Sequence, residues 1–144
     1  MNLSKAAKVT RVMNSVAAGT SDQNSSSVDM QGYRACQFIA AFGAVTASAV
    51  TSVKVETSSD NSTFNDVLGT SVTVADDDDN QVVLLDIAQP LERYLRITIS
   101  RDTANAVVDG VFALQYLASS EPVTHDATTV VDSEFHLAPA EGTA

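Results

Sequence analysis

Short runs in which apolar and polar residues alternate constrain the fold of this chain more than any other feature of its sequence. Successive side chains of an extended strand point to opposite faces, so a period of two marks a strand with one buried face. Strand-like runs lie at 9–13, 36–42, 53–56, 71–74, 82–85, 95–100 and 112–116. Seven or eight short strands separated by polar turns predict an all-β protein with a single jelly-roll or β-sandwich domain.

Two runs carry a more specific expectation. The continuous apolar run 82–85 is typical of a strand that is covered on both faces. Phe112, Leu114 and Tyr116 form one face of the last strand, and we expect this aromatic face to point inward. Both expectations concern which side chains meet the core.

Two other segments are less regular. The stretch 40–49 is rich in alanine, but Gly43 and its β-branched residues favour a loop over a helix. The pair Asp109-Gly110 fits either a hairpin turn or a bulge inside a long final strand, and the sequence does not decide between them.

Charge is distributed unevenly along the chain, which has 144 residues and a formal net charge of -10. Residues 119–144 contain five acidic residues and neither Lys nor Arg, so half of the net charge lies there. We predict a core at 35–118 with extended arms: an N-terminal arm with the first strand or strands at 1–34, and an acidic C-terminal extension at 119–144. The apolar residues suited to anchor this extension on a partner are Val130, Val131, Phe135 and Leu137.

The composition argues against nucleic-acid and membrane partners. Eight Lys and Arg stand against 18 acidic residues, too few to neutralise a phosphate backbone. No apolar run approaches the roughly 20 residues of a membrane-spanning helix, and the N-terminus lacks a secretory signal, so we expect a soluble chain made inside the cell, in the cytoplasm. The single cysteine, Cys36, lies in an apolar run and is expected to be a buried structural thiol.

No catalytic motif is present, so we expect no enzyme activity, no catalytic residues and no cofactor. Both histidines, His125 and His136, fall in the predicted extension, where no fixed pocket is expected. The run Asp76–Asp79 is the most visible candidate for a calcium site, with Asp76 and Asp78 as its ligands. Adjacent side chains of an extended segment diverge, however, and we favour a solvated acidic hairpin without metal.

Arg93 and Arg96 are candidates for an interface with an acidic segment of a partner. The alternative is that they only offset Asp86, Glu92 and the neighbouring acidic loop. The sequence supports both interpretations equally.

Two segments resemble galactose-binding-like jelly rolls. The stretch 53–67 is similar to a strand–turn–strand of that family. Within it, 58–64 (Ser-Ser-Asp-Asn-Ser-Thr-Phe) matches the family's Ser-x-Asp-Gly-Ser-x-aromatic turn, with Asn61 in the glycine position because Asn tolerates left-handed conformations. The stretch 93–97 (Arg-Tyr-Leu-Arg-Ile) is similar to the strand that follows. The resemblance implies the fold and carries over no sugar-binding residue. A carbohydrate-binding virion adhesin remains an alternative, for which Tyr33 and Tyr94 are the exposed aromatic candidates.

The longer stretch 35–118 resembles small structural proteins of tailed bacteriophages, above all at 86–96, 105–111 and 113–116. The resemblance implies a head decoration, or cement, protein that binds the outer surface of the major capsid lattice and stabilises the head by bridging neighbouring subunits. Its expected partners are the major capsid protein and further copies of itself, as a trimer first and a dimer second. Its expected location is the capsid surface of the virion, and the alternative is a tail or head–tail connector component.

Overall fold

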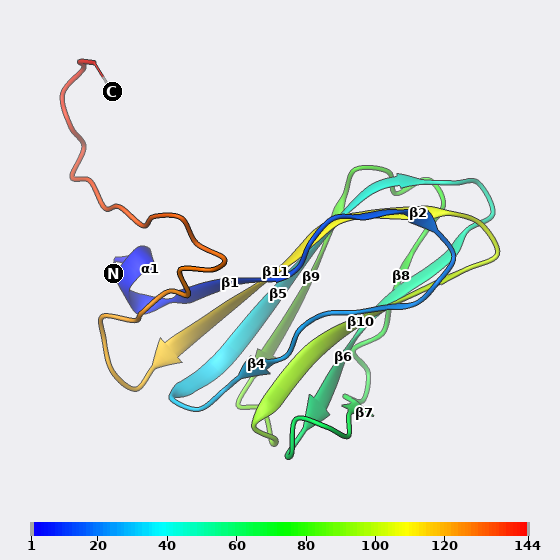
Figure 1. Cartoon of the computed structure of the whole chain (residues 1–144), viewed down its shortest axis with the longest axis horizontal. Coiled ribbons are helices and arrows are strands. Elements are labelled where there is room, and N and C mark those ends of the chain that lie inside the picture. The colour runs from blue at the N-terminus through cyan, green and yellow to red at the C-terminus, as the bar shows by residue number, and fades with distance from the viewer. Residues whose placement is uncertain (1, 144) are drawn as a thin grey trace.

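Two antiparallel β-sheets packed face to face make up the body of the protein in the computed structural model, which describes residues 2–143 (Figure 1). Sheet A runs in the order β1 (Lys8–Met13), β11 (Ala106–Ala118), β5 (Tyr33–Val45) and β9 (Val82–Ala88), and β2 (Val16–Gly19) also pairs with β11. In sheet B, β10 (Tyr94–Asp102) lies between β6 (Val50–Ser58) and the short strands β3 (Gln23–Asn24) and β4 (Val28–Asp29). The other edge of β6 pairs with β7 (Asn65–Asp66) and β8 (Val72–Val74). A four-residue helix, α1 (Leu3–Ala6), precedes β1.

The chain passes repeatedly from one sheet to the other. After β1 and β2 in sheet A come β3 and β4 in sheet B, β5 in sheet A, and β6 to β8 in sheet B, and then β9, β10 and β11 alternate between the two sheets. Neighbours in the order β1-β11-β5-β9, facing β3/β4-β10-β6-β7/β8, form the connectivity of a jelly roll. The predicted fold class, an all-β protein with a single β-sandwich domain, is confirmed.

The core between the sheets consists mainly of small and β-branched side chains. Phe38 and Phe42 of β5 are its fully buried aromatic residues, and Leu95, Ile97 and Ile99 of β10 lie opposite in sheet B. These three residues alternate with more polar neighbours, as the period-two run at 95–100 predicts.

The last strand, β11, faces the other way from our expectation. Ala113 and Gln115 are buried in the core, whereas Phe112, Leu114 and Tyr116 are half-buried on the outside of sheet A. The prediction that this aromatic face points inward is therefore wrong. Both faces of the strand are largely apolar, so periodicity identifies the strand without showing which face meets the core.

Strand β9 lies at the edge of sheet A and is covered on one face only. Val82 and Leu84 are 56% and 55% exposed, while Val83 and Leu85 pack against the core. The expectation of a strand covered on both faces is wrong for the single chain. The uncovered side chains lie on the same outer face of sheet A as Phe112.

Strand β5 extends into the alanine-rich segment that we expected to form a loop. Ala40 and Phe42 take inward positions and are buried, which gives this stretch a core-facing side. Position 43 favours glycine, because the side chains of Val107 and Asp109 lie so close that an added Cβ would meet each at 3.0 Å. Burial of this face outweighs the weak strand propensity of alanine and glycine.

Two turn residues adopt special conformations. Asn61 has φ of 57°, the left-handed conformation that lets it take a glycine position in the turn. The register of β11 against β5 shifts between Ala106 and Val108 and again between Val108 and Gly110. Asp109-Gly110 is therefore part of a bulge within β11 and not a hairpin turn.

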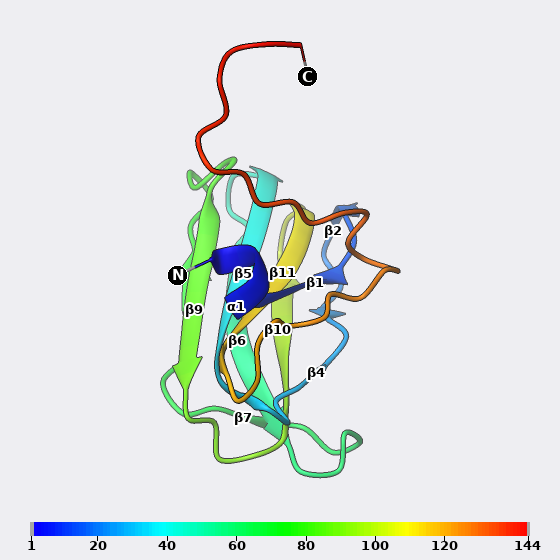
Figure 2. The ribbon, with the colours of Figure 1, turned by 90° about the vertical axis from the view of Figure 1, so that its left-hand side faces the viewer.

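The two ends of the chain differ in how they join the sandwich. Residues 8–29 form β1 to β4 and pair with strands of both sheets, so this part of the N-terminal region belongs to the body. Residues 119–143 contain no helix or strand, and both ribbon views show them passing α1 and then projecting away from the sandwich (Figures 1 and 2). Within residues 2–143 no helix has the length and apolar character needed to cross a membrane.

Candidate functional site

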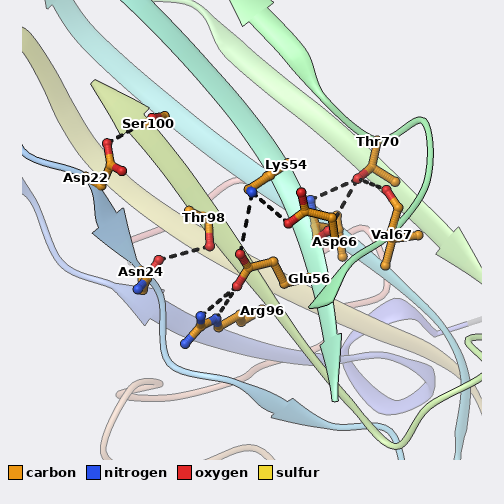
Figure 3. Close-up of polar contacts among 11 residues, drawn as sticks. Asp22, Asn24, Lys54, Glu56, Asp66, Val67, Thr70, Arg96, Thr98 and Ser100 are labelled. Atoms are coloured by element: carbon orange, nitrogen blue, oxygen red, sulfur yellow. Dashed lines mark hydrogen bonds and ion pairs between the residues drawn. The ribbon is translucent and has the colours of Figure 1, made fainter. Parts of the chain in front are cut away.

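A network of alternating charges covers the outer face of sheet B (Figure 3). Arg96 on β10 donates from Nε and Nη2 to Oε2 of Glu56 on β6, at 2.7 and 2.6 Å. Lys54 Nζ lies 3.7 Å from the other oxygen of Glu56 and 2.6 Å from Oδ1 of Asp66 on β7. The hydrogen bond to Asp66, with the nearby carboxylate charges, raises the pKa of Lys54 above its usual value. As a whole this cluster of two cations and two anions is neutral.

The network is packed as well as paired. Glu56 is only 8% exposed, and the guanidinium of Arg96 stacks on the ring of Phe64, 4.0 Å from its centroid. Phe64 belongs to the turn that resembles galactose-binding-like proteins. Farther along β10, Thr98 and Ser100 donate to Asn24 and Asp22 at 2.9 Å each, which ties the β3 segment to the sheet (Figure 3).

Arg93 lies in the loop before β10 and is held by a different acid. Its Nε and Nη2 donate to the two carboxylate oxygens of Asp29 at 2.9 and 2.7 Å, and Nη2 also donates to Oε1 of Gln31 at 2.6 Å. The guanidinium lies 5.2 Å from the ring centroid of Tyr94. The acids that neutralise Arg93 and Arg96 are therefore Asp29 and Glu56. Acids of this chain thus offset both arginines, as the alternative expected, but these acids are Asp29 and Glu56 and not Asp86, Glu92 or the acidic loop. An interface role for the two arginines stays a prediction.

The Asp29–Arg93 pair predicts a small loss of stability in acid. The hydrogen bond from Arg93 holds the pKa of Asp29 below its usual value, so the pair stabilises the fold above about pH 4 and loses this effect as the pH falls through the lowered pKa. Both side chains are more than 40% exposed, so solvent screening keeps the contribution of the pair small. We expect Asp29→Asn, which keeps the oxygen that accepts from Gln31, to reduce the acid-induced fall of the thermal midpoint. Identical pH profiles for the two proteins would contradict this expectation.

Tyr33 and Tyr94, the aromatic candidates for sugar binding, are both half-buried. Tyr33 packs against the core, and its burial raises the pKa of the phenol. The ring of Tyr94 lies under the Arg93 guanidinium. The expectation that these rings are exposed is wrong, and neither of them forms an open platform of the kind that sugars stack on.

The acidic run Asp76–Asp79 accepts backbone hydrogen bonds from the end of β5 and the turn that follows it. Asp79 accepts from the backbone N–H of Val45 and Asp76 from that of Ser48, each at 2.6 Å. Asp78 accepts from the N–H of Ala75 within its own loop at 2.9 Å. Asp76 and Asp78 thus bind separate backbone segments, and no three His, Cys, Asp or Glu side chains between residues 2 and 143 are grouped to hold a metal ion.

The Cys36 thiol is fully buried in β5, and burial raises its pKa to about 12. Because the thiolate is the reactive species, we expect the native protein at pH 8 to react with a thiol reagent at least about a hundredfold more slowly than the denatured protein. The release of chromophore from an aromatic disulfide reagent, followed with and without denaturant, measures the ratio. Equal rates would contradict burial of the thiol.

The base of the C-terminal extension is tied to the N-terminal segment. The N–H of Val123 donates to the carbonyl of Lys5 at 2.8 Å. The ring of His125 lies 2.9 Å from the carbonyl of Ser4 through Nε2, and its Nδ1 accepts from the N–H of Val9 at 3.3 Å. The imidazole of His125 thus connects Ser4 in α1 with Val9 in β1. From the sequence we expected no fixed pocket around His125 and did not predict this structural contact.

Beyond this point the predicted anchors separate into two groups. Val130 is half-buried and Phe135 is 53% exposed, and both line a shallow hollow with Leu3 and Val9. The other two predicted anchors stand free of the body, since Val131 is fully exposed and Leu137 is 83% exposed. The extension therefore presents apolar side chains at its surface.

Arg101 is a buried charged residue that the sequence reasoning missed. It follows Leu95, Ile97 and Ile99 in the inward phase of β10 and is only 3% exposed. An arginine that continues an apolar phase is the sequence signal that would have identified it. It contacts the backbone of three other segments and has a structural role.

Comparisons with known proteins show the fold of the chain and no family. No protein-family model and no curated protein matches it. Among solved structures it is similar to the crystal structure of the PBSX exported protein XepA, with a TM-score of 0.55 and 18% sequence identity. The similarity covers 94% of this chain and 45% of that one, so the chain spans less than half the length of that protein. At this identity the likeness concerns the fold alone.

Proposed function

We propose that this chain is a bacteriophage capsid decoration, or cement, protein that binds the outer surface of the major capsid lattice and stabilises the head by bridging neighbouring subunits. The observation that carries the proposal is the C-terminal extension, whose base is fixed to the body while Val131, Phe135 and Leu137 remain exposed. The resemblance of 35–118 to small phage structural proteins supports it. The fold shared with a PBSX exported protein is compatible with it.

The extension has the chemistry of a segment that binds by burying a few side chains in a partner. Phe135 and Leu137 are two residues apart, so in an extended conformation they point to the same side. Such a segment adds to an exposed sheet edge through its main chain, while alternate side chains fill pockets. Its acidic residues favour a partner groove with Lys or Arg at its rim.

Because a capsid lattice repeats the same binding site many times, binding through the C-terminal extension becomes stronger when several copies of the chain are joined. One arm with two or three apolar side chains gives weak binding, but an oligomer engages several lattice positions at once and gains affinity from effective concentration. A trimer or dimer of the chain would therefore bridge adjacent capsid subunits without a large interface for any one arm.

Removal of the arm tests the proposal. A chain that ends after Asp126 keeps the His125 contacts and is expected to retain the thermal midpoint of the full chain, but to lose at least about tenfold in affinity for heads that lack the protein. Co-sedimentation with such heads, purified from the phage that encodes the chain, measures the affinity.

A point variant and a control make the result specific. Phe135→Ser with Leu137→Ser is expected to reproduce the loss, whereas Leu68→Ser with Leu91→Ser changes two fully exposed leucines elsewhere and is expected to bind normally. Unchanged head binding by the truncated chain would overturn the proposal. Particle images that place the chain on the tail would favour the tail or connector alternative instead.

A further inference from the structure

The outer face of sheet A carries apolar side chains that are only partly covered by the rest of the described chain. One row crosses the whole sheet, because Arg11 on β1 pairs with Phe112 on β11, Phe112 with Ile39 on β5, and Ile39 with Leu84 on β9. Paired residues of an antiparallel sheet lie on the same face, so these four side chains stand side by side. Two residues farther along the strands, Ala41 on β5 pairs with Val82 on β9 and extends the apolar surface.

The next row consists of Ala41 beside Val82, which is 56% exposed. The outer face of an antiparallel sheet is normally polar, and sheet B of this molecule follows that rule with its charged network. The outer face of sheet A has polar residues such as Gln37 and Asp86 in one row, but its rows of Leu84 and Val82 are apolar and partly exposed. An apolar surface that remains partly exposed in an acidic protein marks a candidate interaction site.

The helix α1 limits this surface at one end. Leu3 and Ala6 lie beside Gln37 and Leu114 around a hollow, and Figure 2 shows α1 in front of sheet A. The rows of Leu84 and Val82 lie beyond α1 and remain open. We call this open part the sheet-A face; it comprises Arg11, Ile39, Ala41, Val82, Leu84 and Phe112.

The charges at its two edges are complementary to each other. Arg11, at the β1 edge, is exposed, lies 5.8 Å from the ring centroid of Phe112 and pairs with no carboxylate of residues 2–143. Asp86, at the β9 edge, is exposed and accepts a hydrogen bond from Tyr116. When two copies meet face to face about a two-fold axis parallel to the strands, the β1 edge of each lies over the β9 edge of the other.

We propose that the sheet-A face packs against the same face of a second copy of this chain, with Arg11 of each copy beside Asp86 of the other. The contact buries Leu84 and Val82, which the single chain leaves exposed, covers the half-buried Phe112 further and gives Arg11 a carboxylate partner. It also gives β9 the cover on both faces that its apolar run indicates. The proposal concerns self-association and is independent of what the C-terminal extension binds.

The contact is isologous and closes at two copies. Because the sheet-A face is small, we expect a weak dimer with a dissociation constant of about 10–100 μM. Sedimentation velocity over a range of concentrations measures this constant for the full chain. A mass that stays monomeric up to about 1 mM, or a trimer as the largest species, would overturn the proposal.

A pair of matched leucine variants locates the surface. Leu84 and Leu91 are both exposed, but Leu91 lies in the loop after β9 and outside the sheet-A face. We expect Leu84→Arg to raise the dissociation constant at least tenfold and Leu91→Arg to leave it unchanged, both with the thermal midpoint of the original chain. Equal constants for Leu84→Arg and the original chain would overturn the proposal.

Exchange of the edge charges tests the pairing itself. Arg11→Asp and Asp86→Arg each place like charges together in a homodimer and are expected to weaken it about tenfold. In an equimolar mixture the heterodimer has opposite charges at both contacts, so association returns to the original strength. Failure of the mixture to recover would overturn the arrangement. Loss of head binding by Leu84→Arg without any change in self-association would assign the surface to the capsid instead.

Discussion

Replacement of Arg101 by alanine is expected to lower the free energy of unfolding by about 3–5 kcal/mol, a large part of the stability of a domain of this size. Its guanidinium donates to the carbonyls of Ser21, Ala17 and Ala106 at 2.8, 2.9 and 2.8 Å. Hydrogen bonds from a charged donor contribute about 1.5–3 kcal/mol each, and buried carbonyls left without a donor add to the loss.

The position of these carbonyls explains why one side chain has this effect. Ala17 lies in β2, Ser21 in the loop that follows it, and Ala106 at the start of β11, while Arg101 itself comes from β10. The Arg101 guanidinium thus links β10 of sheet B to β2 and β11 of sheet A and to the loop that follows β2. Gly19 allows the close approach, since a Cβ there would meet Nη2 of Arg101 at 3.3 Å.

Chemical denaturation of Arg101→Ala measures the loss. Arg34→Ala is the matched control, because Arg34 is exposed, and its change is expected to stay within about 0.5 kcal/mol. Arg101→Lys keeps the charge but lacks the planar fork that reaches three carbonyls, so an intermediate loss is expected. Equal midpoints for Arg101→Ala and Arg34→Ala would show that the carbonyls find other partners.

The fold class could be predicted from the sequence because alternation is a local signal. Val53 and Val55 alternate with Lys54 and Glu56, and the structure places the first two in the core and the other two outside. The facing of β11 could not be predicted this way. Its two faces are both apolar, and the choice depends on which one meets sheet B, a contact between segments distant in sequence.

The candidate site was predictable to a smaller extent for the same reason. Arg93 and Arg96 were found as charged residues near a strand, but their acids, Asp29 and Glu56, lie 64 and 40 residues away along the chain. The exposed residues of the extension were easier to identify. Val131 and Leu137 lie in a segment whose composition changes abruptly, and such a change needs no knowledge of the sheets.

Phe38→Ala is expected to cost about 3–5 kcal/mol, at the upper end of the range for a buried aromatic side chain. Phe38 is fully buried, and three of its four inner-face neighbours in sheet A are small: Cys36 and Ala40 on its own strand and Ala113 on β11, with Leu85 on β9 as the larger one. Such neighbours cannot move into the space left by a ring, so the cavity persists and the lost contacts are not replaced.

The measurement is the free energy of unfolding in urea, with Leu91→Ala as the control. Leu91 is fully exposed, so its truncation is expected to change stability by less than about 0.5 kcal/mol. Phe38→Leu keeps most of the apolar volume and is expected to lose less than half as much as Phe38→Ala. If Phe38→Ala lost no more than Leu91→Ala, the core would have to collapse around the missing ring. A chain whose one cysteine is buried as a free thiol has no disulfide to limit the loss, so its stability depends on this packing.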